Sequence, residues 1–93
     1  MQELQVLLIE DNPGNVRYVR ELLDEATWFH AGMVHAGRLQ EGLDRLKEQR
    51  VDVVLLDLHL PDSKGADTFM KFQQAAGNIP WLVLAGGDDE ILA

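Results

Sequence analysis

Four short apolar stretches alternate along the chain with segments in which apolar residues recur every three or four positions. The apolar stretches span residues 6–9, 29–36, 53–56 and 81–85. Runs of this length are typical of strands in a parallel sheet that helices cover. The third run is unbroken, which predicts a strand buried on both faces, and it leads directly into Asp57. Pro61 follows and stops the strand because it has no N–H to donate. The second run is irregular and contains Gly32, so we expect it to form an edge strand.

The segments between the apolar stretches have the periodicity of helices. They run from the Asn12-Pro13 turn to Glu25, from Leu39 to near Arg50, and from Gly65 to Ala76. In the first of them we expect the core-facing side chains to be Val16, Val19, Leu22 and Leu23. In the last we expect them to be Phe69, Phe72 and Ala76. Gly77 is a typical helix-ending residue, and residues 86–90 predict a turn and the start of another helix.

Regular alternation of strands and helices predicts an α/β fold with a parallel sheet and right-handed crossovers. We expect a flavodoxin-like, three-layer α/β/α arrangement with strand order 2-1-3-4. The 93 residues are enough for one domain, residues 1–93, and too few for two. In this winding the first and third strands are neighbours, so Glu10, Asp11 and Asp57 should meet at the carboxyl edge of the sheet.

Composition excludes several classes of protein. The chain is 46% hydrophobic and 26% charged, which is typical of a globular domain, and no apolar run approaches the length of a membrane helix. The formal net charge of −8 argues against direct nucleic-acid contact. The chain has no cysteine and its N-terminus lacks the basic start of a signal peptide, so we expect a cytoplasmic protein.

Converging carboxylates repel one another and raise each other's pKa unless a positive charge intervenes. A hard divalent cation such as Mg²⁺ takes oxygen ligands and often needs only one or two protein carboxylates. The sequence therefore predicts a cation site at Glu10, Asp11 and Asp57. The alternative is that these acids cap the following helices or face solvent.

Three sequence motifs resemble the receiver domain of two-component response regulators. They are Leu7-Leu8-Ile9-Glu10-Asp11-Asn12-Pro13, Leu55-Leu56-Asp57-Leu58-His59-Leu60-Pro61-Asp62 with Gly65, and Ile79-Pro80-Trp81-Leu82-Val83-Leu84. The resemblance extends over essentially the whole chain. It implies a signal-transduction module of a phosphorelay.

The resemblance also implies a role for each site residue. Asp57 corresponds to the aspartate that accepts a phosphoryl group from a histidine kinase or phosphotransfer protein. Glu10 and Asp11 correspond to the acidic pair that binds Mg²⁺, and the backbone carbonyl of His59 to a further ligand. We expect the His59 side chain to face solvent. Such a domain is not an enzyme beyond Mg²⁺-dependent self-phosphorylation and self-dephosphorylation.

The chain departs from the family pattern in two respects. Ala85 stands where the family has a Ser or Thr that binds the phosphoryl group. The family also continues through a fifth strand, which ends in a lysine, and a fifth helix, so we expect a receiver domain truncated at its C-terminus. Its fourth strand would then have an exposed edge, at which a second copy could pair to form a homodimer.

Other functions remain open. Ala85 favours a pseudo-receiver that is not phosphorylated and serves as a protein-interaction scaffold. A phosphatase with an aspartate nucleophile would need a second acid two residues after Asp57, where this chain has His59. The segment Gly86-Gly87-Asp88-Asp89-Glu90 superficially resembles a cyclic-dinucleotide synthase motif, but it lies at a predicted strand-to-helix turn.

Overall fold

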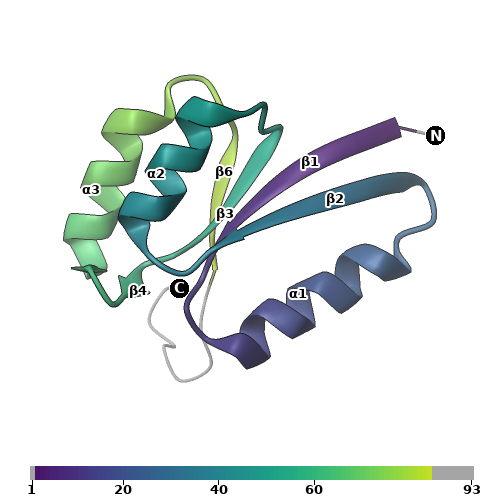
Figure 1. Ribbon diagram of the computed structural model, residues 1–93, viewed down its shortest axis with the longest axis horizontal. Helices are drawn as coiled ribbons and strands as arrows, with labels where there is room; N and C mark the ends of the chain where they lie inside the picture. The colour runs from purple at the N-terminus through teal and green to yellow at the C-terminus, as the bar shows by residue number, and fades with distance from the viewer. Residues whose placement is uncertain (1, 85–93) are drawn as a thin grey trace.

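The computed structural model describes residues 2–84 and contains one parallel sheet of four strands (Figure 1). The strands are β1 (Gln2–Ile9), β2 (Phe29–Ala36), β3 (Val53–Asp57) and β6 (Trp81–Leu84). Their order in the sheet is β2-β1-β3-β6, and every neighbouring pair is parallel. This confirms the predicted order, in which the first and third strands are neighbours.

Within residues 2–84, three helices cover the two faces of the sheet. They are α1 (Pro13–Glu25), α2 (Leu39–Glu48) and α3 (Gly65–Ala76). In Figure 1, α2 and α3 lie together on one face and α1 lies on the other, which confirms the three-layer arrangement. The second helix, predicted to end near Arg50, ends at Glu48, because the backbone of Gln49 turns to an extended conformation. No helix in the described part of the chain is long and apolar enough to cross a membrane.

The start of α1 follows from the Asn12-Pro13 turn. The Asn12 Oδ1 accepts hydrogen bonds from the N–H groups of Gly14 and Asn15, at 2.8 and 3.2 Å. Pro13 occupies the first helical position, where a missing N–H costs nothing. The turn after β1 is therefore fixed locally, which sets the direction in which the chain leaves the sheet.

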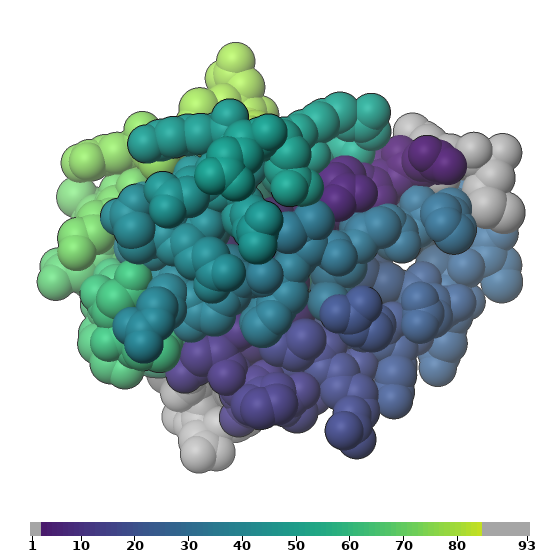
Figure 2. All heavy atoms as spheres, in the orientation of Figure 1, coloured from purple at the N-terminus to yellow at the C-terminus, as the bar shows by residue number. Residues whose placement is uncertain are grey.

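The main core lies between the sheet and the α2–α3 layer. Its fully buried members include Leu7 and Ile9 from β1, Val54 and Leu56 from β3, and Phe72 from α3. The first residues of β1 reach the surface in the space-filling view (Figure 2), whereas Val6–Ile9, in the second half of the strand, are buried. A rigid central strand gives the residues that follow it a fixed position.

Three expectations about burial were wrong. Val53 and Leu55 are only half-buried, so β3 is fully covered on the α2–α3 face alone. Leu22 of α1 is 48% exposed, at the rim of an apolar hollow between α1 and the sheet. Phe69 of α3 is 38% exposed, and Thr68 takes the buried position instead.

The burial of Thr68 has a specific cause. Its hydroxyl donates a hydrogen bond of 2.8 Å to the Ser63 hydroxyl, which is also buried. Both groups can therefore leave water without losing a partner. The outward shift of Phe69 places its ring against Trp81 of β6, with 5.1 Å between the ring centres.

A short hairpin connects β3 to α3. Its strands are β4 (His59–Leu60) and β5 (Ser63–Lys64), and they pair antiparallel. Leu60 is fully buried in the core, which holds the hairpin against the domain. The predicted turn and helix over 86–90, and Ala85, lie outside the residues that the structure describes.

Candidate metal centre

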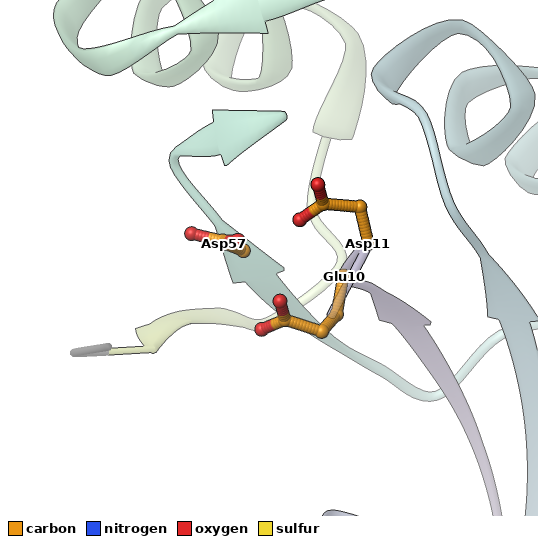
Figure 3. Close-up of side chains that lie close together, drawn as sticks. All are labelled: Glu10, Asp11 and Asp57. Atoms are coloured by element: carbon orange, nitrogen blue, oxygen red, sulfur yellow. The ribbon is translucent and has the colours of Figure 1, made fainter. Parts of the chain in front are cut away.

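Three carboxylates converge at the carboxyl edge of the sheet (Figure 3). Glu10 and Asp11 directly follow β1, and Asp57 is the last residue of β3. The parallel register pairs Ile9 with Leu56, so the next residue on each strand faces the same edge. One oxygen atom from each of the three side chains lies within 4.8 Å of the others. The structure thus brings together the three residues that the sequence placed at this edge.

The three carboxylates differ in their exposure. Glu10 is only 2% exposed, Asp57 is half-buried and Asp11 is exposed. A site of this kind has a buried floor at Glu10 and an open side at Asp11. A cation or a phosphoryl donor can therefore reach the cluster from solvent.

The backbone of Glu10 is held from the neighbouring strand. Its N–H donates to the carbonyl of Ala36 at 2.9 Å, and its carbonyl lies 2.7 Å from the His35 Nε2. Its side chain is held from the following turn, because the Asn12 N–H donates to the Glu10 Oε2 at 3.1 Å. These contacts fix the direction of the Glu10 carboxylate toward Asp57.

Burial raises the pKa of Glu10 from its ordinary 4.5 to about 7. The hydrogen bond from the Asn12 N–H opposes this rise, and the neighbouring Asp57 carboxylate adds to it through its charge and a hydrogen bond. Glu10 and Asp57 therefore resist carrying two negative charges side by side. A cation between them would remove this penalty.

Asp57 is oriented by the hairpin that follows it. The His59 N–H donates to the Asp57 Oδ1 at 3.0 Å, and the His59 side chain is exposed, as expected. The other Asp57 oxygen takes no hydrogen bond from this amide. The role of the His59 carbonyl as a metal ligand stays a prediction.

The donor set fits a hard cation. It consists of carboxylate oxygens alone, which suit Mg²⁺ or Mn²⁺ and not a metal that prefers sulfur or nitrogen. Between residues 2 and 84, the ion pairs with Lys or Arg are Arg45–Glu41 and Arg50–Asp52, and neither includes the three carboxylates. Protein cations within this part of the chain thus leave the cluster without a counter-charge.

The alternative holds only in part. Asp11 faces solvent, but Asn12 is the residue that caps α1, and α3, the helix that follows Asp57, has no side-chain cap hydrogen bond. The first amides of α2 donate to Asp62. Asp62 and His35 were both missed as supporting residues. No local sequence signal indicates that Asp62, a turn residue, bonds to a distant helix. The contact of the His35 ring depends on strand register and has no such signal either. The Asn12-Pro13 pair is a helix-start signal, but its amide contact to Glu10 was not anticipated.

Comparisons with known proteins agree on one family. The family model of the response regulator receiver domain matches residues 6–93. The cell cycle transcriptional regulator CtrA of Caulobacter vibrioides is 34% identical over 86 residues, which are 92% of this chain and 36% of CtrA. The chain therefore spans about a third of the length of the curated relatives it matches.

Solved structures give the same result. The phosphorylated cyanobacterial phytochrome response regulator RcpA is 26% identical with a TM-score of 0.74, over 97% of this chain and 71% of RcpA. The Mn²⁺-bound form of the response regulator Rcp1 is also 26% identical with a TM-score of 0.74, over 95% of this chain and 71% of Rcp1. The MaeR response regulator bound to beryllium trifluoride has a TM-score of 0.76 at 20% identity, over 99% of this chain and 74% of MaeR, and supports the fold alone.

Proposed function

The chain belongs to the response regulator receiver family, a component of two-component phosphorelay signalling, and on this premise we propose that Asp57 accepts the phosphoryl group. In this proposal Glu10, Asp11 and Asp57 hold a Mg²⁺ ion, together with the His59 carbonyl. Receiver domains in general bind Mg²⁺ in an acidic pocket, and the cluster described above is the corresponding feature of this chain.

The observation that carries the proposal is the convergence of three carboxylates from two adjacent strands. A buried glutamate whose pKa is raised by burial and by an adjacent aspartate is costly to the folded protein. Such groups are concentrated at functional sites because a ligand can compensate them. Purely structural acids would have no need of this arrangement.

Two of the solved relatives support the same chemistry. RcpA is described as phosphorylated and Rcp1 as bound to Mn²⁺, and both share 26% of their residues with this chain over the matched part. Mn²⁺ and Mg²⁺ favour the same oxygen ligands. The proposal extends these two properties to the Asp57 cluster.

The chemistry assigned to each residue is simple. An Asp57 oxygen attacks the phosphorus atom, an oxygen–phosphorus bond forms, and the bond from phosphorus to the donor's histidine nitrogen breaks. The bound cation would neutralise negative charge on the transferred group. The His59 N–H holds the Asp57 Oδ1, which leaves the second oxygen to act as nucleophile. The buried Glu10 would bind the cation from the inner side of the site.

Receiver domains generally act with histidine kinases or phosphotransfer proteins and are generally not enzymes themselves. We propose such a donor for this chain, with Mg²⁺-dependent self-phosphorylation and self-dephosphorylation as its own activity. The cytoplasmic location and the absence of direct nucleic-acid contact stay predictions. So does pairing of a second copy at the β6 edge, which a concentration series in sedimentation would detect.

The test is the intact mass of the protein after incubation with Mg²⁺ and a small acyl phosphate. We expect one added phosphoryl group in the wild type and none in Asp57→Asn. Asp44→Asn, an exposed aspartate on α2, is the matched control and should be phosphorylated normally. A calorimetric titration with Mg²⁺ completes the comparison.

Three outcomes would contradict the proposal in different ways. A folded protein that binds Mg²⁺ but takes up no phosphoryl group would support the pseudo-receiver scaffold instead. A phosphoryl group that persists in Asp57→Asn would place the acceptor elsewhere. Failure to bind Mg²⁺ at millimolar concentration would show that the three carboxylates are not a Mg²⁺ site.

A further inference from the structure

We propose that Asp62 is a positioning residue that links the β4–β5 hairpin to α2 and so holds the His59 N–H against Asp57. Asp62 touches none of the three carboxylates in the hydrogen bonds described for it. Its effect on the cation site passes through the hairpin. The part of this inference that concerns Mg²⁺ rests on the proposed function.

Asp62 bridges two elements that are far apart in sequence. Its Oδ1 accepts a hydrogen bond from the Leu39 N–H at 2.8 Å, and its Oδ2 accepts one from the Gln40 N–H at 3.0 Å. Leu39 and Gln40 are the first two residues of α2. Both carboxylate oxygens are thus engaged with one helix end.

The start of α2 depends on this distant carboxylate. Arg38, the residue at the N-cap position, provides no side-chain hydrogen bond. The first amides of a helix have no partner within the helix, and a negative charge is favourable beside them. Although burial acts in the opposite direction, the Gln40 and Leu39 amides lower the pKa of Asp62 below its ordinary 3.8. Asp62, in the turn of the hairpin, therefore provides the capping acceptor that the residues next to α2 do not provide.

The same hairpin ends at the candidate site. Asp62 lies in the turn between β4 and β5, whose paired residues are His59 with Lys64 and Leu60 with Ser63. The His59 N–H donates to the Asp57 Oδ1 at 3.0 Å. One end of the hairpin thus contacts the phosphoryl acceptor of the proposal, and its tip is fixed to α2.

The experiment must separate positioning from simple helix capping. Asp62→Ala removes both roles, whereas Asp62→Ala with Arg38→Ser restores a local cap on α2 without the link to the hairpin. Asp62→Asn removes the charge but keeps an acceptor oxygen. Arg38→Ser alone is the matched control. All five proteins are compared by urea unfolding, by Mg²⁺ titration in a calorimeter, and by hydrogen exchange of the His59 amide.

We expect Asp62→Ala to weaken Mg²⁺ binding by about tenfold, which is typical for loss of a residue that orients a ligand. The double variant should recover the stability of α2, yet keep the weakened Mg²⁺ binding and the faster exchange of the His59 amide. Asp62→Asn, which keeps one of the two hydrogen bonds to α2, should weaken Mg²⁺ binding less than Asp62→Ala does.

Recovery of both Mg²⁺ affinity and amide protection in the double variant would overturn the inference, because Asp62 would then act only as a cap. If the wild type binds no Mg²⁺, the proposed cation site is wrong. The His59 exchange rate then decides the inference by itself: faster exchange in the double variant supports it and an unchanged rate refutes it.

Discussion

Replacing Glu10 by glutamine should stabilise the metal-free protein at high pH. The pKa of Glu10 in the folded protein is about 7, against an ordinary 4.5. This difference corresponds to about 3 kcal/mol of folding free energy. Glutamine keeps an acceptor oxygen for the Asn12 N–H but carries no charge. The variant therefore escapes the cost of holding an ionised carboxylate beside Asp57.

The sign of the pH dependence follows from the raised pKa. Below about 4.5 Glu10 is protonated in both the folded and the unfolded chain, so its ionisation costs nothing. Above about 7 it is ionised in both, and the folded protein carries the full cost of burial. Glu10 therefore favours the folded state increasingly as the pH falls from about 7 to about 4.5. We expect the variant to exceed the wild type by about 3 kcal/mol at about pH 8 and by less than about 1 kcal/mol at about pH 5.

Urea unfolding followed by circular dichroism, with a chelator present, measures this difference. Comparing variant and wild type at each pH cancels the titration of the groups that do not interact with Glu10. Glu48→Gln makes the same change at an exposed position of α2 and should alter stability by less than about 0.5 kcal/mol. Adding Mg²⁺ at about pH 8 should stabilise the wild type more than the variant. An advantage of Glu10→Gln that is equal at both pH values would refute the reasoning.

Two further substitutions test the packing that supports the site. Gly42→Ala in α2 would place a Cβ 2.7 Å from the Ile9 Cγ1. Although alanine has the better helix propensity, we expect urea unfolding to show that the free energy of unfolding falls by about 1–2 kcal/mol. Unchanged stability would show that Ile9 can move aside. Thr68→Val leaves the buried Ser63 hydroxyl without the donor that Thr68 provides and should cost about 1–3 kcal/mol, whereas Thr68→Val combined with Ser63→Ala should cost much less. Equal losses in the single and double variants would mean that the hydrogen bond is unimportant.

The sequence was sufficient to predict the order of the sheet. Apolar runs alternate with helical segments, and parallel connections leave few ways to arrange them. The convergence of Glu10 and Asp57 followed from that order, because Glu10 directly follows β1, Asp57 ends β3, and these two strands are neighbours. The roles of these residues in phosphoryl transfer came from the family resemblance and stay proposals.

The features that the sequence did not predict depend on contacts between distant segments. Phe69 has the spacing of a core residue, yet Thr68 is buried because Ser63 of the hairpin offers it a hydrogen bond. Leu22 is exposed because, among the elements between residues 2 and 84, α1 alone covers its face of the sheet. The link from Asp62 to Leu39 joins a turn to a helix end, and no periodicity in either segment indicates it.

The parallel sheet also has a consequence for the speed and order of folding. Within residues 2–84, β4 and β5 are the strands that can pair as a local hairpin, whereas β1 must wait for Val53–Leu56 before its second edge is covered. Non-local pairing of this kind slows folding. During synthesis the central run Val6–Ile9 leaves the ribosome before β3 and stays partly uncovered until β3 follows, so we expect chaperones to bind the nascent chain most strongly in that interval.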